Sequence, residues 1–237
     1  MPSSPTPTWA PELLARAYYS DDSVVLIHGD CLTQTAWLDA DVLCTDPPYG
    51  YNATLSHGVG GKYGLSPWVG QPIANDDSLD ARSAMLAAWG QRPALVFGSW
   101  KMPKPEGTHT VLTWDKGDAA GMGDLSVPWK PNTEEIYVIG KGFQGTRDSS
   151  ILRAQVVTWA SKGREHPNMK PVALMQALIA KCPPGTIADP FAGSGSTGVA
   201  AKALGRKAIL VELEEKYCEI AARRLSQDVL DFSGGAA

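Results

Sequence analysis

Short apolar, β-branched runs recur along the chain and predict a set of buried strands. There are seven such runs, at residues 24–28, 41–45, 94–98, 110–114, 135–139, 186–188 and 207–211. Several are apolar at nearly every position, which is typical of a sheet covered on both faces. Stretches with helical spacing lie between some of them, at residues 79–89, 171–181, 196–204 and 214–225. This alternation predicts an α/β fold.

The alternation weakens over residues 110–140, where two predicted strands follow one another without a helix. That segment predicts an antiparallel hairpin with a long connection at residues 116–133. No linker divides the chain, so we predict a single domain over residues 23–227, with flexible tails at 1–22 and 228–237. The glycine-rich stretch 57–70 predicts a long loop without regular structure.

Composition argues against a membrane protein. The 237 residues are 43% apolar and 19% charged, and no apolar run approaches the roughly 18 residues that a spanning helix needs. The first eleven residues lack the basic and apolar parts of a signal peptide, so we expect a cytoplasmic protein that does not bind membranes. The four cysteines (Cys31, Cys44, Cys182, Cys218) form no C-x-x-C pair, which predicts buried, reduced thiols and no zinc site.

Charge is unevenly distributed along the chain. It carries 21 Lys and Arg residues against 25 Asp and Glu residues, a net charge of −4. Residues 141–170 are nevertheless basic, with Lys141, Arg147, Arg153, Lys162, Arg164 and Lys170 against Asp148 and Glu165. Such a segment is either a phosphate-binding surface or a solvated charged face, and composition alone favours neither.

A glycine-rich turn, A-D-P-F-A-G-S-G-S-T-G at residues 188–198, joins a predicted strand to a predicted helix. Its glycines allow close approach by a ligand, and the helix start offers unpaired N–H groups. The turn contains G-x-G-x-x-G, and Glu212 lies 23 residues after Asp189, where an acid can bind ribose hydroxyls. A dinucleotide fold needs further βαβ units, yet only 39 residues follow Gly198. We therefore predict a nucleotide-type loop, with a ligand-free glycine turn as the alternative.

A second motif, T-D-P-P-Y-G at residues 45–50, directly follows a predicted strand. Two successive prolines lack N–H groups, which leaves carbonyl oxygens to accept from a ligand. Asp46 adds a carboxylate and Tyr49 a flat ring. This combination suits an exocyclic amino group on a ring that can stack, although a Pro-Pro turn capped by Asp and Tyr would have the same sequence.

Together these motifs resemble those of the S-adenosylmethionine-dependent DNA amino-methyltransferases, in the permuted group where D-P-P-Y precedes D-P-F-x-G-S-G. Further segments agree in order: H-G-D-C at 28–31, W-D-K at 114–116 with E-E-I at 134–136, H-P-N-M-K-P at 166–171, and G-R-K through E-E-K-Y over 205–217. The resemblance covers about residues 24–225. It implies a doubly wound, Rossmann-like, circularly permuted sheet of about seven mostly parallel strands with an antiparallel hairpin. It also implies that the strand ending at Ala188 lies beside the strand ending at Thr45, with the carboxyl ends of both at the edge where the strand order reverses.

The resemblance also implies site residues. It assigns catalysis to Asp46, Pro47, Pro48 and Tyr49. It assigns cofactor binding to Asp30, Cys31, Asp46, Lys170, Asp189, Phe191, Ala192, Gly193, Ser194, Gly195, Ser196, Thr197 and Glu212. Asp30 would accept from the cofactor adenine, Glu212 would bind ribose, and Lys170 would approach the cofactor carboxylate. Val211 stands where the family often has Gly before the ribose acid. No metal is implied.

DNA is the implied partner, and its target base would be flipped into the site and stacked on Tyr49. Three short loops, at residues 52–75, 116–133 and 141–165, would contact DNA, with residues 58–70 as a candidate lid. We assign phosphate contacts to Lys62, Arg147, Arg153, Lys162 and Arg164. Because this group often forms dimers, a homodimer is a candidate assembly, in the cytoplasm of a prokaryotic or phage-infected cell.

Adenine N6 is favoured over cytosine N4 as the acceptor because Asp precedes Pro-Pro-Tyr, where the cytosine-N4 enzymes usually carry Ser. Three other classes remain open. A nicotinamide oxidoreductase is disfavoured by chain length, and a protein or RNA amide methyltransferase would more often show Asn before Pro-Pro-Tyr. A DNA-binding module without catalysis is disfavoured by the intact Asp46 and Tyr49.

Overall fold

The structure, a computed structural model, describes residues 9–51, 74–119, 123, 125–156 and 169–227. Several predicted features lie outside these ranges. They are the candidate lid at 58–70, Lys62, Lys162 and Arg164 among the predicted phosphate contacts, residues 166–168 of the H-P-N-M-K-P segment, and the two ends of the chain at 1–8 and 228–237.

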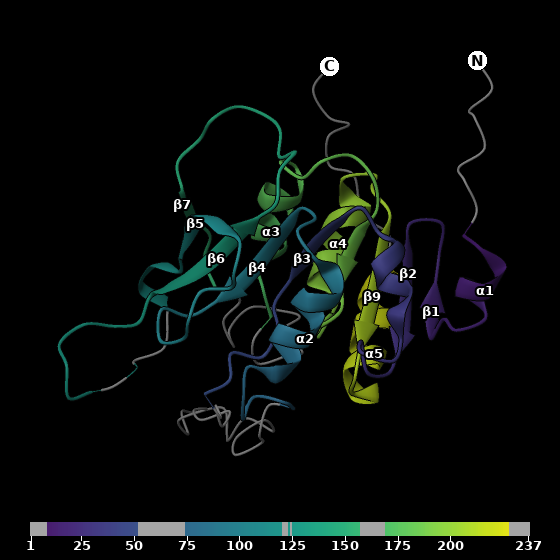
Figure 1. Cartoon of the computed structure of the whole chain (residues 1–237), viewed down its shortest axis with the longest axis horizontal. Helices are drawn as coiled ribbons and strands as arrows, with labels where there is room; N and C mark the ends of the chain where they lie inside the picture. Colours follow the sequence, from purple (N-terminus) through teal and green to yellow (C-terminus); the bar gives the residue numbers. More distant parts are fainter. Residues whose placement is uncertain (1–8, 52–73, 120–122, 124, 157–168, 228–237) are drawn as a thin grey trace.

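Nine strands form one sheet in the order β1-β2-β9-β8-β3-β4-β6-β5-β7 (Figure 1). Their bounds are β1 Tyr19–Ser20, β2 Val24–His28, β3 Val42–Thr45, β4 Ala94–Gly98, β5 Thr108–Asp115, β6 Thr133–Ile139, β7 Ile151–Arg153, β8 Ile187–Asp189 and β9 Ala208–Glu212. Neighbouring strands are parallel except in the pairs β1/β2, β4/β6 and β5/β6. The predicted α/β fold, its mostly parallel sheet and its antiparallel hairpin are therefore confirmed.

Helices cover both faces of the sheet (Figure 1). The α-helices are α1 Pro11–Leu14, α2 Asp80–Trp89, α3 Val172–Ile179, α4 Ser196–Ala203 and α5 Glu215–Leu225, and the 3₁₀ helices are η1 Thr35–Asp39 and η2 Gly117–Ala119. Helices α3, α4 and α5 pack on one face of the sheet, whereas α2 and η1 pack on the other.

Strand β2 explains why the predicted strands are apolar at nearly every position. Val24 and Leu26 belong to the core on the α4 and α5 side, whereas Val25 and Ile27 belong to the core on the η1 and α2 side. Successive side chains of a strand point to opposite faces, so a strand covered on both faces needs an apolar residue at each position.

Residues 9–22 differ from the flexible tail predicted for them. Helix α1 and strand β1 lie here, and Tyr19 and Ser20 pair antiparallel with β2. The Trp9 indole N–H also donates to the Asp21 carbonyl oxygen at 2.7 Å. Strand β7, at the other end of the sheet, was likewise not predicted. Both strands have only two or three residues, too few for a periodic pattern.

The connections define which edge of the sheet can bind ligands. From β8 the chain passes through α4 to β9, and from β3 it passes through α2 to β4 in the opposite direction along the sheet. The strand order thus reverses between β8 and β3, and open α/β sheets bind ligands at the carboxyl ends of the strands at such a point. Strand β6 runs antiparallel to β4, with Glu135 opposite Gly98, so β6 starts at this same edge.

The described helices include none that combines the length and apolar character needed to cross a membrane. All four cysteines are free and buried, as predicted. They pack as small apolar side chains, and Cys31 lies beside the buried Trp37 in the core on the η1 side.

Trp37 provides a test of this core. Its ring is fully buried, stacks on Trp89 with 5.9 Å between ring centres, and donates its N–H to the Cys31 carbonyl oxygen. We expect Trp37→Ala to lower the free energy of unfolding by about 3–5 kcal/mol, because it leaves a cavity and an unpaired carbonyl. Trp100→Ala, at an exposed indole, should change it by less than about 0.5 kcal/mol. Urea unfolding of both variants checks this, and equal effects would contradict the assignment.

Candidate active site

Four parallel strands bring polar residues to one edge of the sheet. In spatial order β2, β9, β8 and β3 end at His28, Glu212, Asp189 and Thr45. Because their carboxyl ends lie side by side, the H-G-D-C segment, the acid after Val211, the glycine-rich turn and the D-P-P-Y turn form a continuous row. The predicted adjacency of the strands that lead into the two main motifs is confirmed by the pairing of β3 with β8.

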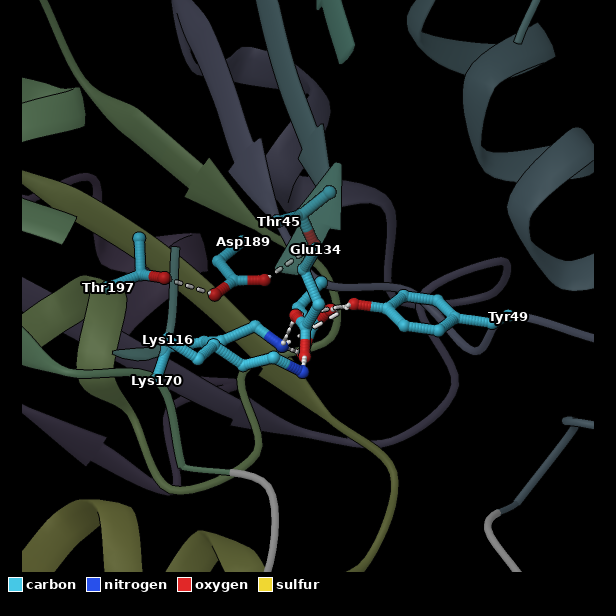
Figure 2. Close-up of polar contacts among 8 residues, drawn as sticks. Thr45, Tyr49, Lys116, Glu134, Lys170, Asp189 and Thr197 are labelled. Carbon is cyan, nitrogen blue, oxygen red and sulfur yellow. Dashed lines mark hydrogen bonds and ion pairs between the residues drawn. The ribbon is translucent and has the colours of Figure 1, made fainter. Parts of the chain in front are cut away.

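Asp189 links the D-P-P-Y turn to the glycine-rich turn by hydrogen bonds (Figure 2). One oxygen of its carboxylate accepts from the Thr45 hydroxyl at 2.6 Å and from the Phe191 N–H at 3.1 Å, and the other accepts from the Thr197 hydroxyl at 2.5 Å. Burial raises the pKa of Asp189 to about 6, although the hydrogen bonds oppose that rise. The side chains of Asp189 and Thr197 thus bond one another across the turn, and the cofactor contacts assigned to both stay predictions.

The glycine-rich turn is held by contacts to its backbone. Gly193 has φ 51° and Gly195 has φ 76°, a left-handed conformation that favours glycine. The Gly193 N–H donates to Glu212 Oε2 at 2.7 Å. From α5, Arg224 donates to the carbonyl oxygen and the hydroxyl of Ser194. Sequence reasoning missed Arg224, because no spacing relates it to the turn.

The acids at the ends of β2 and β9 differ in burial. Glu212 is buried, its Oε1 accepts from the Glu214 N–H at 2.9 Å, and burial raises its pKa. Asp30 is exposed, and its Oδ1 accepts from the Leu32 N–H at 2.9 Å. Both carboxylates thus lie at the predicted edge of the sheet and retain lone pairs for further donors.

The carboxylate of the D-P-P-Y turn is bonded through both oxygens. Asp46 Oδ1 accepts from the Tyr49 hydroxyl at 2.8 Å, and Asp46 Oδ2 lies 2.7 Å from the ammonium of Lys170. Burial raises the pKa of Asp46, a rise that Lys170 opposes and the neighbouring Glu134 supports. The turn therefore presents a carboxylate whose position is fixed before any substrate arrives.

Glu134 joins this turn to the hairpin (Figure 2). Its Oε2 lies 3.0 Å from the Lys170 ammonium and accepts from the Tyr49 hydroxyl at 3.2 Å, while its Oε1 lies 3.1 Å from the Lys116 ammonium. Burial alone would raise the pKa of Glu134, but the two ammonium groups outweigh it and lower that pKa. Two carboxylates and two ammonium groups thus form a cluster whose formal charges cancel.

Lys170 is paired with two carboxylates. Its ammonium contacts Asp46 and Glu134, and it lies 4.9 Å from the centre of the Phe97 ring. Its contact with the cofactor carboxylate stays a prediction. Burial alone would lower the pKa of Lys170, yet these two carboxylates raise it. A buried ammonium needs anionic partners, which the carboxylates at the ends of β3 and β6 supply.

Sequence reasoning did not select Glu134 and Lys116 as site residues, although both lie in quoted segments, W-D-K at 114–116 and E-E-I at 134–136. Their place in these two segments was the signal that could have identified them.

The predicted phosphate contacts separate in space. Arg147 follows β6, whose last residues lie opposite the start of β4, so this arginine is at the edge remote from the site. Nearby Asp148 pairs there with Lys181. Arg153 ends β7 beside Asp115 at the site's edge, with its side chain 80% exposed. Arg147 therefore lies away from the candidate active site, and the charge of Lys170 is compensated by Asp46 and Glu134.

Sequence comparison relates this chain to known DNA methyltransferases. A sequence model of a family described as DNA methylase matches residues 99–223. The type II methyltransferase M2.DpnII of Streptococcus pneumoniae is 27% identical over 273 residues, covering 91% of this chain and 94% of that protein.

Solved structures share the fold. The complex of M1.HpyAVI with SAM matches with a TM-score of 0.59 at 20% identity, over 86% of this chain and all of that one. PvuII DNA methyltransferase, described as cytosine-N4-specific, matches with a TM-score of 0.66 at 12% identity, over 91% of this chain and 90% of that one.

Asp189 predicts a specific pH dependence. With its pKa raised from 3.8 to about 6, native Asp189 still holds a proton at pH values where the unfolded chain has lost it, so its contribution to stability falls as pH rises. Relative to Asp189→Asn, the free energy of unfolding of the parent should fall by about 2 kcal/mol between pH 4 and pH 7. Urea unfolding of both proteins at several pH values measures this difference. A constant difference would contradict the raised pKa.

Proposed function

Because the chain belongs to the DNA methylase family, we propose that it transfers a methyl group from S-adenosylmethionine to the N6 amino group of an adenine in DNA. One observation carries the proposal: the hydrogen bond from Thr45 to Asp189 holds the D-P-P-Y turn beside the glycine-rich turn. Methyl acceptor and methyl donor must meet within bonding reach, and these two turns are suited to bind them.

The residues at the carboxyl edge fit this cofactor. Asp30 and Glu212 are acceptors at the ends of adjacent strands, matching the amine of an adenine and the hydroxyls of a ribose. Gly193 and Gly195, both left-handed, carry no side chains, so a ligand can approach the backbone of the turn closely at these two positions. The cofactor supplies an electrophilic methyl group on a positively charged sulfur. The remaining predicted contacts, at Cys31, Phe191, Ala192, Ser194 and Ser196, are retained in this proposal.

Asp46, Pro47 and Tyr49 would act on the acceptor amine. The lone pair of an exocyclic amine is delocalised into its ring, so the amine is a weak nucleophile. Hydrogen bonds from that amine to the Asp46 carboxylate and the Pro47 carbonyl favour the geometry needed for attack. The nitrogen gains a methyl group and loses one proton, for which Asp46 is the adjacent base. Pro48 fixes the backbone of the turn.

Glu134 supports this role of Asp46. Because Glu134 shares the Lys170 ammonium, that cation is not committed to Asp46 alone. The substrate amine can then donate to Asp46 while Lys170 remains paired with Glu134. Glu134 and Lys170 are positioning residues in this proposal.

Exposed cations would contact the DNA phosphates. Arg153 is exposed and lies at the edge of the sheet that holds the site, and Lys62, Lys162 and Arg164 are proposed as further phosphate contacts from the sequence. The order of the motifs, with Asp46 before Gly193, supports the permuted group. A homodimer is proposed because members of that group often form dimers.

Cytosine N4 is the second candidate acceptor, because the fold is also that of the cytosine-N4-specific PvuII enzyme. Asp46 in front of Pro47 favours adenine. To decide, DNA from a host without adenine methylation is incubated with the protein and labelled cofactor, then digested to nucleosides. N6-methyl-2′-deoxyadenosine among the products supports the proposal, and N4-methyl-2′-deoxycytidine replaces it.

Asp46→Ala tests the catalytic assignment. The fold and cofactor binding should persist, because Lys170 keeps Glu134 as a partner, whereas methyl transfer should fall at least about 100-fold. Asp39→Ala, at an exposed acid of η1, serves as the matched control and should keep parental activity. Single-turnover transfer of a labelled methyl group gives the rate. Activity within threefold of the parent would remove Asp46 from the mechanism.

Gly193→Leu tests the cofactor turn. The new side chain should abolish S-adenosylmethionine binding in calorimetry, because it enters a turn whose backbone faces the proposed ligand. Gly205→Leu is the control, since Gly205 has a similar φ of 63°, open space around it and a place after α4 away from the site. Backbone strain is then common to both variants. Equal loss of binding in both would indicate unfolding or strain alone.

A further inference from the structure

Two exposed aromatic rings flank one lysine beside the catalytic turn. Trp100 is 71% exposed and Tyr51 is 44% exposed. The Lys101 ammonium lies 5.6 Å from the centre of the Tyr51 ring and 5.9 Å from that of the Trp100 ring. We call Tyr51, Trp100 and Lys101 the aromatic platform.

The platform continues the proposed active site. The rings of Tyr49 and Tyr51 have centres 6.0 Å apart. Trp100 follows the carboxyl end of β4, and β4 pairs with β3, the strand that leads into the D-P-P-Y turn. A base held on Tyr49 would therefore have its neighbours along the strand close to Tyr51 and Trp100.

We propose that the aromatic platform stacks on the DNA base adjacent to the flipped target, with Lys101 at the phosphate between them. This inference rests on the proposed function, since it presupposes that a base leaves the duplex. Flipping uncovers a face of each neighbouring base, and an aromatic side chain can cover it. The lysine between the rings favours an anionic ligand over an apolar protein surface.

This role explains features that the methyl-transfer site does not use. Trp100 belongs to neither core cluster of the described residues. Stacking tolerates any base, so the platform would strengthen binding without reading sequence. It also gives the acidic chain a local positive charge at the site.

The test uses the full chain and a short duplex containing a methylation site mapped on DNA from a host without adenine methylation. 2-Aminopurine replaces the target base and reports its unstacking by fluorescence. Trp100→Ala should weaken duplex binding by about 5- to 100-fold and reduce the fluorescence gain, whereas Trp100→Phe should stay within about threefold of the parent. Calorimetric binding of S-adenosylmethionine should be unchanged in both.

Lys101→Ala should reduce the slope of log K against log salt by about 0.9. Lys141→Ala, also exposed but beyond the end of β6 at the remote edge, should leave that slope unchanged.

Three results would overturn the inference: parental duplex binding by Trp100→Ala, equal losses in the Ala and Phe variants, or a change of oligomeric state in Trp100→Ala, which would make the platform a contact between copies. Absence of methyl transfer by the parent chain would refute the proposed function itself, and is measured first.

Discussion

The buried Asp189 carboxylate determines how the two halves of the site relate to each other. It accepts hydrogen bonds from groups on β3, on α4 and in the turn after β8, so one side chain sets the spacing of three elements. A charged group in that environment is costly unless it is fully bonded. Because satisfying Asp189 requires Thr45 and Thr197 in place, the substrate turn and the cofactor turn cannot move independently without leaving a buried carboxylate short of donors.

A second constraint follows from burying charge beside the catalytic turn. Lys170 requires anions, and it obtains them from Asp46 and Glu134, which come from different strands. The cluster therefore stabilises the approach of the antiparallel hairpin to the parallel part of the sheet. It also keeps Asp46 a hydrogen-bond acceptor, because the ammonium favours the ionised carboxylate while burial disfavours it.

Much of the sheet and of the two main turns could be predicted from the sequence. Strands covered on both faces appear in it as continuous apolar runs, and the glycine-rich turn appears as a short motif. The pairing of β3 with β8 was predicted through the resemblance. The partners of Lys170 were not, since Glu134 lies 36 residues away and only the sheet register brings it near. The position of Arg147 could not be predicted for a related reason. The basic segment begins directly after β6, which ends at the remote edge, and spacing along the chain does not reveal this.

The net charge of −4 need not oppose binding to DNA, because the local field decides. At the carboxyl edge the carboxylates of Asp46 and Glu134 are neutralised by Lys170 and Lys116, so they add little negative potential. The exposed cations at this edge include Lys101 and Arg153, of which Arg153 also pairs with Asp115. An uncharged base can enter the ion-paired cluster while its phosphates stay outside it. Internal ion pairing thus makes an acidic chain compatible with a polyanionic substrate.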